Sequence, residues 1–289
     1  SLADVSTIDT ENVNVTVPAS VDIAITGDFN AGVDNITLLG GNSLSTFNAG
    51  TIDAAVKVVD GSGFLGNVLV DFGADNFDST VSVTGGDLAT DKVTAVLNTA
   101  ATYVPVTAGV ETLDIDSNGS VTVSLGATSG VSLVQVDLST ANKTVNVSGL
   151  SPTQTVALTG SANANNILKA IPVDATDADN VINFQVKDDA VITAGTQLQT
   201  LDVETVNIKA STTEYLNLSG LTMTAAAKTV TLNLLADPLS VGVAVLTATS
   251  AQTTTINAAF SYGVVQTGRS ATTAVDYTGS AGDDTFIMM

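Results

Sequence analysis

The sequence contains no cysteine, no histidine and no tryptophan among its 289 residues. The missing cysteines exclude disulfides, thiol catalysis and most structural zinc sites, and the missing histidines exclude a Ser-His-Asp arrangement and imidazole metal ligands. Aromatic residues make up only 4% of the chain, so a core has to be built from Val, Ile, Leu and Ala. Side chains of that size suit thin, uniform layers better than a globule packed around aromatic rings.

Positive charge is also scarce: 8 basic residues face 29 acidic ones, for a formal net charge of −21. Nucleic acids and anionic membrane surfaces are both bound through Lys and Arg, so neither is an expected partner. A β-helical polysaccharide lyase would also need cationic side chains, whereas the basic residues here are spread singly. We therefore expect no enzymatic activity. The longest apolar runs, such as Val241–Leu246, are too short to cross a bilayer.

Short segments of alternating apolar and polar residues fill the chain. They include Val13–Val17, Val21–Ile25, Thr80–Thr84, Val121–Leu125, Thr144–Ser148, Tyr215–Leu218 and Thr229–Leu234. Val, Ile and Thr favour extended backbone, and alternation with a period of two predicts strands with one buried face. The sequence therefore predicts an all-β protein.

Many of these segments end in a hydroxyl residue followed by glycine, which accepts the positive φ that a corner requires. The pairs are Thr26-Gly27, Thr84-Gly85, Ser148-Gly149, Thr159-Gly160, Ser219-Gly220 and Thr278-Gly279. A strand that follows a glutamate also recurs, at Glu11, Glu111 and Glu204. Recurring units that bury little by themselves favour stacked coils of roughly 20–25 residues. We predict a right-handed parallel β-solenoid with Ser/Thr-Gly corners, with tandem β-sandwiches as the alternative.

Residues 1–150 and 181–278 are expected to form two solenoid regions. Pro152, Pro172 and an Asn/Asp-rich run lie between them and predict an irregular seam over residues 151–180. Residues 279–289 begin a different motif. No secretion leader is recognisable at Ser1, and both ends look truncated, so we expect a fragment of a longer chain.

The nonapeptide Gly279–Ile287 carries the main chemical signal. It follows the G-G-x-G-x-D-x-U-x pattern of RTX β-rolls, with Ser280 in place of the second glycine. The glycines turn the backbone so that carbonyl oxygens point inward, the aspartate adds carboxylate oxygen, and Ca²⁺ prefers oxygen ligands. Gly282, Asp283 and Asp284 are therefore predicted calcium ligands, and Phe286 is predicted to begin a strand.

Shorter Gly-x-Asp-x-apolar echoes extend this prediction. They occur at Gly32–Ile36 and Gly73–Phe77, with looser versions at Gly86–Val93 and Asp177–Val181. Each echo is also compatible with a simple turn. The candidate calcium ligands in and beside them are Asp34, Asn35, Asp75, Asp78, Asp91, Asp177 and Asp179.

In these features the chain resembles the calcium-dependent RTX-type surface-layer proteins of Gram-negative bacteria, and the large RTX adhesins share much of the pattern. The residues that carry the resemblance are Glu111–Ile115, Glu204–Ile208, the Thr- and Val-rich strands, and Gly279–Ile287. The resemblance implies type I secretion, a parallel β-solenoid body, and Ca²⁺ ions that stiffen the subunits and join them into a sheet.

The leading hypothesis is a structural subunit of an extracellular surface layer on a bacterial cell. It would assemble with itself into a two-dimensional lattice through Ca²⁺ bound by acidic Gly-Asp loops, which would offset the mutual repulsion of the carboxylates. A cell-surface polysaccharide is a second candidate partner. The alternatives are a stalk or ligand-binding segment of a large RTX adhesin and, third, a carbohydrate-active β-helix.

Overall fold

The computed structural model describes residues 11–19, 23–24, 32–138, 140–161, 165–187, 196–210, 221–224, 230–236, 244–247, 253–260, 264–269, 276–279 and 285–288. Regular structure in these residues is almost entirely β-strand, and the helical element among them is the short 3₁₀ turn η1, Leu125–Ala127. The chain divides into two compact units, Ser1–Asp116 with Val123–Gln135, and Ser117–Thr122 with Val136–Met289. Within the described segments, no helix has the length and apolar character of a membrane span.

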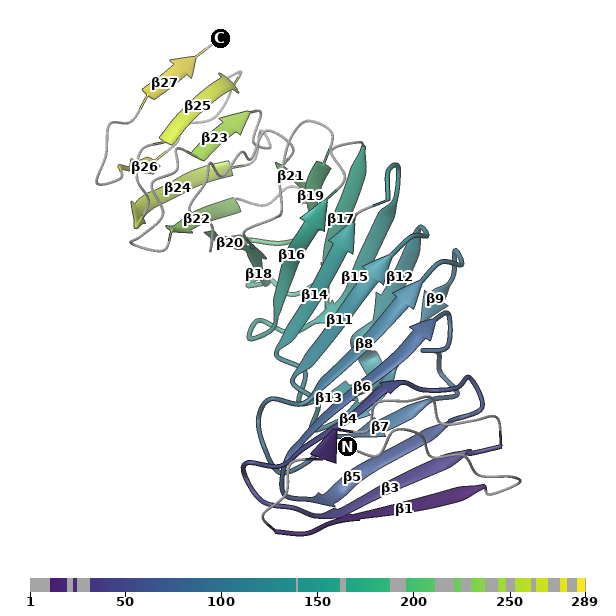
Figure 1. Cartoon of the computed structure of the whole chain (residues 1–289). Coiled ribbons are helices and arrows are strands. Elements are labelled where there is room, and N and C mark those ends of the chain that lie inside the picture. Colours follow the sequence, from purple (N-terminus) through teal and green to yellow (C-terminus); the bar gives the residue numbers. More distant parts are fainter. Residues whose placement is uncertain are drawn as a thin grey trace. The chain divides into compact units, whose positions relative to one another are not determined.

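The strands of the first unit, apart from β9, belong to two sheets. Its strands are β1 (Asn12–Val17), β2 (Ile23–Ala24), β3 (Asn35–Gly40), β4 (Thr46–Thr51), β5 (Val58–Phe64), β6 (Asn67–Ala74), β7 (Ser82–Thr84), β8 (Lys92–Leu97), β9 (Thr102–Tyr103), β10 (Val106–Ala108), β11 (Thr112–Ser117) and β13 (Thr128–Ser129). One sheet has the order β1-β3-β5-β7-β10-β13, and the other contains β2-β4-β6-β8-β11 (Figure 1). In most coils, consecutive strands therefore alternate between the two sheets.

The second unit repeats this alternation. Its strands are β15 (Thr144–Leu150), β16 (Thr155–Ser161), β17 (Asn166–Pro172), β18 (Val181–Val186), β19 (Thr196–Leu201), β20 (Thr205–Ala210), β21 (Leu221–Thr224), β22 (Val230–Ala236), β23 (Ala244–Thr247), β24 (Thr253–Phe260), β25 (Val264–Arg269), β26 (Asp276–Thr278) and β27 (Thr285–Met288). The sheet orders are β15-β17-β19-β21, β16-β18-β20-β22-β24-β26 and β23-β25-β27. Three strands carry residues of both units: β11, whose last residue is Ser117, β12 (Val121–Ser124) and β14 (Leu133–Leu138).

The strands pair in parallel, one coil apart. Asn12 pairs with Asn35, 23 residues later (35 − 12 = 23). In the second unit Val181 pairs with Thr205, 24 residues later (205 − 181 = 24). The predicted parallel β-solenoid is confirmed, and these coils have the expected length. The alternative of tandem antiparallel sandwiches is wrong for the described strands.

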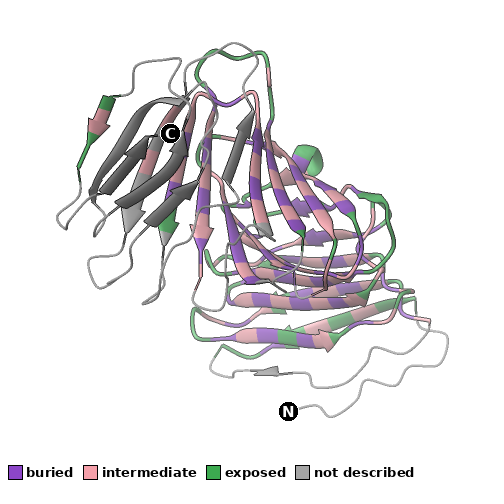
Figure 2. Ribbon diagram, turned by 90° about the horizontal axis from the view of Figure 1, so that it is seen from above, coloured by how far each residue is buried: buried purple, intermediate pink, exposed green. Residues whose placement is uncertain are grey.

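The core follows from the alternation in the sequence. In β18 the even-numbered residues are buried and the odd-numbered ones are partly exposed, as period two requires. Figure 2 shows the same alternation along the other well-described strands. The larger core side chains are phenylalanines, and the rings of Phe72 and Phe77 stack with centroids 5.1 Å apart. The phenylalanines whose burial is described, Phe47, Phe64, Phe72, Phe77 and Phe184, therefore fill the interior of the coils.

Two of the predicted Ser/Thr-Gly corners lie inside strands. Gly149 falls within β15, where its φ of 80° accompanies a register shift, so it forms a β-bulge. Gly160 falls within β16, where a Cβ atom would lie 2.7 Å from Oδ1 of Asp137. Thr84 ends β7 and Gly85 follows it, so this pair lies at a strand end as predicted. The pairs Thr26-Gly27 and Ser219-Gly220 lie outside the described residues.

Strands cover residues 155–161 and 166–172 of the range 151–180, where the prolines led us to expect an irregular seam. Both β16 and β17 lie in this range, and both are paired with neighbouring coils. Pro152 lies in the turn before β16 and Pro172 ends β17, so neither removes an N–H group from a strand interior. Residues 173–180 form a turn-rich loop.

The close approach of neighbouring coils can be tested at Gly85. A Cβ atom at this position would lie 2.0 Å from the carbonyl oxygen of Gly109 in the following coil and 2.3 Å from Oδ2 of Asp91. We expect Gly85→Ala to lower the free energy of unfolding by about 3 kcal/mol or more, because backbone atoms would have to move. Chemical denaturation would measure the loss. Gly126→Ala is the control, since its nearest neighbour would be Ser124 Oγ at 3.8 Å; equal losses in both variants would contradict the prediction.

Candidate functional site

Asp75, a predicted calcium ligand, binds a loop of the next coil. It lies just after β6 with a φ of 58°. Its Oδ1 accepts hydrogen bonds from the N–H groups of Asn98 (2.7 Å) and Thr99 (3.0 Å) and from the hydroxyl of Tyr103 (3.0 Å). Burial acts to raise the pKa of Asp75, but these donors outweigh it and lower the pKa. The carboxylate therefore acts as a link between coils.

Asp78, Asp34 and Asn35 also have local partners. Asp78 Oδ1 accepts hydrogen bonds from the N–H group of Thr80 at 2.8 Å and from its hydroxyl at 2.5 Å, and the hydroxyl is the main reason that the pKa of Asp78 is lowered. Asn35 opens β3, and its Nδ2 donates to Asn12 Oδ1 at 2.9 Å. Asp34, one residue earlier, is exposed. These residues lie in turns and at the start of a strand.

Asp91 is a fully buried carboxylate at the corner before β8. Its side chain is 0% exposed, with Oδ1 accepting the N–H group of Val68 and Oδ2 that of Gly86, both at 2.6 Å. Its own N–H group donates to Glu111 Oε2 at 2.9 Å. Burial raises the pKa of Asp91 to about 6; the two N–H donors oppose the shift and the charge of Glu111 adds to it. This residue thus joins three successive coils.

Asp177 and Asp179 belong to an exposed acidic loop, which we define as residues 174–179. Asp174, Asp177 and Asp179 are all exposed in it. The loop is held from beneath by Asn180, which is only 6% exposed. Asn180 Nδ2 donates to the carbonyl oxygens of Asp174 at 2.8 Å and Asp177 at 3.2 Å. The side chain of Asn180 therefore fixes the loop, and within it Asp174 Oδ1 accepts the N–H group of Thr176 at 2.9 Å and Asp177 Oδ1 that of Asp179 at 3.3 Å.

The structure does not bring the predicted ligands together. Across the described ranges, no three acidic side chains form a group that could hold a metal ion. The remaining candidates, Gly282, Asp283 and Asp284, lie outside the described residues. The strand expected at Phe286 is present as β27. Calcium binding at the nonapeptide stays a prediction.

The recurring glutamate has a role that the sequence pattern did not specify. Glu111 precedes β11, and its Oε2 accepts the N–H group of Asp91 in the previous coil, as given above. Glu204 precedes β20, and its Oε2 accepts the N–H group of Asn180 at 2.8 Å, 24 residues earlier. The carbonyl oxygen of Glu11 accepts two N–H groups of the next coil, from Asp34 at 3.0 Å and Asn35 at 2.9 Å. The recurring glutamate links neighbouring coils, and its recurrence along the sequence is the signal from which this role could have been predicted.

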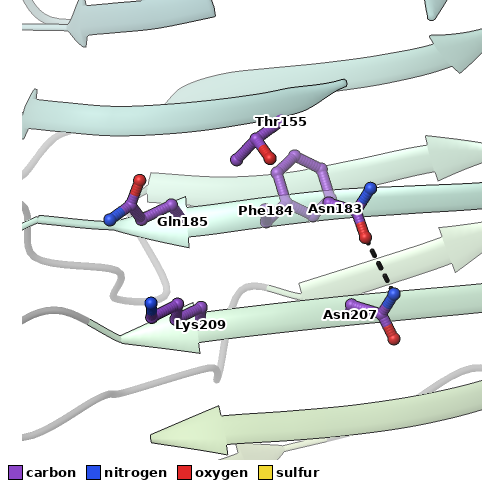
Figure 3. Close-up of a pocket in the computed structure, with 6 residues that line it drawn as sticks. All are labelled: Thr155, Asn183, Phe184, Gln185, Asn207 and Lys209. Atoms are coloured by element: carbon purple, nitrogen blue, oxygen red, sulfur yellow. Dashed lines mark hydrogen bonds between the residues drawn. The ribbon is translucent and has the colours of Figure 1, made fainter. Parts of the chain in front are cut away.

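A row of asparagines runs across the outward side of β18, β20 and β22. Asn207 Nδ2 donates to Asn183 Oδ1 at 2.8 Å, drawn in Figure 3, and Asn233 Nδ2 donates to Asn207 Oδ1 at 2.7 Å. Asn183 Nδ2 donates to the carbonyl oxygen of Pro152 at 2.8 Å. The amides therefore form a continuous ladder that links neighbouring strands.

A shallow hollow of about 280 Å³ lies along this ladder. Its lining residues are Thr155, Asn183, Phe184, Gln185, Asn207 and Lys209. Gln185 and Lys209 are register partners on β18 and β20, and Figure 3 shows their side chains at one end of the hollow. Amide, hydroxyl and ammonium groups can bind the hydroxyl or carboxylate groups of a small polar ligand. The hollow is thus suited to weak binding of a polar molecule.

None of the family models, curated proteins and solved structures compared with the chain matches it. The proposed function therefore depends on the sequence pattern and on the contacts within the solenoid.

The raised pKa of Asp91 predicts that the contribution of this residue to stability falls as pH rises. Its pKa in the folded state, about 6, lies above the ordinary value of 3.8, so the folded protein binds the proton more tightly than the unfolded chain. Its contribution to the free energy of unfolding should fall by on the order of 3 kcal/mol as pH rises from about 4 to about 7. Asp91→Asn should remove this slope, measured by urea denaturation at successive pH values.

Asp78→Asn is the control for that measurement. The pKa of Asp78 is lowered, so its contribution is present above its ordinary pKa of 3.8 and is lost as pH falls below that value. The Asp78→Asn curve should therefore keep the wild-type slope from pH 4 to pH 7 and change slope relative to the wild type only at more acidic pH. A wild-type curve and an Asp91→Asn curve that run parallel from pH 4 to pH 7 would contradict the assignment.

The asparagine ladder predicts a second stability effect. Asn207→Asp removes the donor to Asn183 Oδ1 and sets two oxygen acceptors against each other, so we expect a loss of about 1–2 kcal/mol. Asn14→Asp makes the same change at an exposed position of β1 and should leave stability nearly unchanged. Thermal and urea denaturation of both variants would measure the difference. Equal stability of the two variants would show that the ladder contributes nothing.

Proposed function

We propose that the protein is a structural, non-enzymatic subunit of an extracellular bacterial surface layer, secreted by a type I system, that assembles with itself and uses Ca²⁺ to do so. The observation that carries this proposal is that some carboxylates link neighbouring coils whereas others are exposed on the surface. Asp75, Asp91 and Glu111 link the coils, whereas the acidic loop at 174–179 presents three aspartates to solvent. The linked coils support a rigid scaffold, and the outward carboxylates support a cation-dependent contact.

The charge of the chain supports the same proposal. Copies with a formal net charge of −21 repel one another at short distance. A divalent cation shared between carboxylates of two copies offsets that repulsion, and Ca²⁺ readily takes six to eight oxygen ligands from separate chains or from water. The acidic loop and the nonapeptide Gly279–Ile287 are the proposed calcium-binding segments.

The hollow beside Lys209 favours one alternative, a ligand-binding segment of a large adhesin. Its amide and ammonium groups suit a polysaccharide of the cell surface as a partner. A stalk or binding segment would remain monomeric in calcium, whereas a layer subunit would form sheets. The self-association assay below separates the two, and a screen on acidic and neutral glycans tests the hollow and any carbohydrate-active role.

Removal of calcium tests the proposal directly. The wild-type protein in millimolar calcium should form sheets visible by negative-stain microscopy, and a chelator should dissolve them and lower the melting temperature. The double variant Asp177→Asn/Asp179→Asn should need several-fold more calcium to assemble, because two outward carboxylates are lost.

The matched control is Asp53→Asn/Asp87→Asn, which removes the same charge from the first unit. Asp53 Oδ1 accepts the N–H group of Ala55 at 2.8 Å, a bond that the asparagine oxygen retains. A protein that stays monomeric in calcium, or whose melting temperature ignores both calcium and chelator, would rule out the proposed mechanism.

A further inference from the structure

Three of the exposed large apolar side chains come from one corner of the first unit. Leu44 is 78% exposed, Leu65 is 49% exposed and Leu39 is 41% exposed. Leu39 and Leu44 lie where β3 passes into β4, and Leu65 lies where β5 passes into β6, one coil later. We call these three residues the leucine corner. A leucine in water is common by itself, but a group of them on one surface marks a contact site.

Backbone contacts place the two coils of the leucine corner against each other. The N–H group of Leu65 donates to the carbonyl oxygen of Gly40 at 2.8 Å, and that of Asn67 donates to Ser45 at 2.9 Å. The first bond joins the residue after Leu39 to Leu65 itself. The second joins the residue after Leu44 to the start of β6. The three leucines are therefore neighbours on adjacent levels of the stack.

The residues beside Leu39 and Leu65 include two glycines, Gly63 and Gly66, where a Cβ atom would clash with neighbouring atoms. A Cβ atom at Gly63 would lie 2.7 Å from Leu39 Cδ2, so the side chain of Leu39 rests on this glycine. A Cβ atom at Gly66, beside Leu65, would lie 2.2 Å from the carbonyl oxygen of Ser45. The buried ring of Phe64 lies 2.9 Å from the same Cβ position at Gly66, so the glycine also leaves room for this ring beneath the corner.

The most exposed of the three leucines is held in position by its own loop. The N–H group of Leu44 donates to Asn42 Oδ1 at 2.7 Å, and the N–H group of Asn42 donates to Ser45 Oγ at 3.0 Å. Ser45 is fully buried. The turn is thus fixed on both sides of Leu44, and its side chain is presented to solvent at little further cost in conformational entropy on binding.

The leucine corner also lacks charge. Residues 35–52 and 61–70 contain no Asp, Glu, Lys or Arg, in a chain with 29 acidic residues. One coil further on, the exposed Asp87 marks the edge of the uncharged surface. Two copies of this protein can therefore bring these two described segments together without opposing their carboxylates, whereas acidic segments elsewhere repel an identical copy.

We propose that the leucine corner is a contact surface between two copies of this chain, formed by apolar burial and independent of calcium. The same corner on both copies would meet about a two-fold axis, as self-complementary surfaces do. Three leucines cover less than the roughly 800 Å² per partner of a standard interface, so we expect a weak association. The inference deepens the self-assembly in the proposed function and rests on that part of it.

Sedimentation velocity in the presence of a chelator tests the inference. The wild-type protein should dimerise with increasing concentration, and Leu44→Asp/Leu65→Asp should weaken the dimer at least about tenfold, because charge enters the apolar contact. Val106→Asp/Val173→Asp is the matched control, since these valines are 39% and 69% exposed elsewhere. It should dimerise like the wild type. A monomeric wild type, or equal dimerisation of all three proteins, overturns the inference.

A cysteine variant provides a second test, which does not depend on whether Leu44→Asp/Leu65→Asp folds. The chain has no cysteine, so Leu44→Cys introduces a single thiol. Under mild oxidation it should form disulfide-linked dimers faster than Val173→Cys, and equal rates overturn the inference. Dimers in chelator report on the leucine corner, whereas sheets that require calcium report on the proposed function. Either result can therefore fail while the other stands.

Discussion

The structure depends on the hydrogen bonds that join each coil to the next at its corners. Within the sheets the strand ladders satisfy the backbone, but at a corner the chain turns and its N–H and carbonyl groups need other partners. The carbonyl oxygens of Glu11, Glu111 and Glu204 each accept N–H groups from the following coil. Buried side chains complete the pairing where the backbone cannot, as Asp91 and Asn180 do. This requirement sets the coil length, because the hydrogen bonds at one corner can form only if the corner of the next coil lies in register with it.

That constraint reassigns two of the acidic residues that the pattern singles out. Asp75 and Asp91 follow glycines as calcium-binding aspartates do, yet their oxygens accept hydrogen bonds from neighbouring coils. An N–H donor and a metal ion compete for the same lone pairs, so a carboxylate that closes a corner is poorly placed to bind calcium as well. The proposal of calcium-dependent assembly therefore moves to the nonapeptide and to the exposed loop at 174–179, where the N–H groups of Thr176 and Asp179 in the same loop donate to Asp174 Oδ1 and Asp177 Oδ1. The ligand sets of both segments would have to be completed by another copy.

The fold was largely predictable because its signals are local. Period-two alternation located strands such as β1, β15 and β22, and the recurrence of the glutamate indicated stacking. The partners of Asp75 were not predictable, because Asn98 and Thr99 lie 23 and 24 residues away and no short pattern distinguishes them. The same holds for Gly160, whose missing side chain leaves room for Asp137 of another strand. Prolines misled at residues 151–180, since a proline at a strand end costs no ladder bond.

The two proposed modes of association differ in what controls them. A contact through acidic loops depends on calcium and weakens as ions screen or compete for the carboxylates. A contact through uncharged leucines depends on apolar area and is nearly indifferent to salt and calcium. A strongly acidic protein can therefore pair through its uncharged corner before calcium is available, and calcium then joins the pairs. Each dimer carries two acidic loops instead of one. Once one loop of a dimer has bound a neighbouring dimer through calcium, the effective concentration of the second loop for the same neighbour is raised.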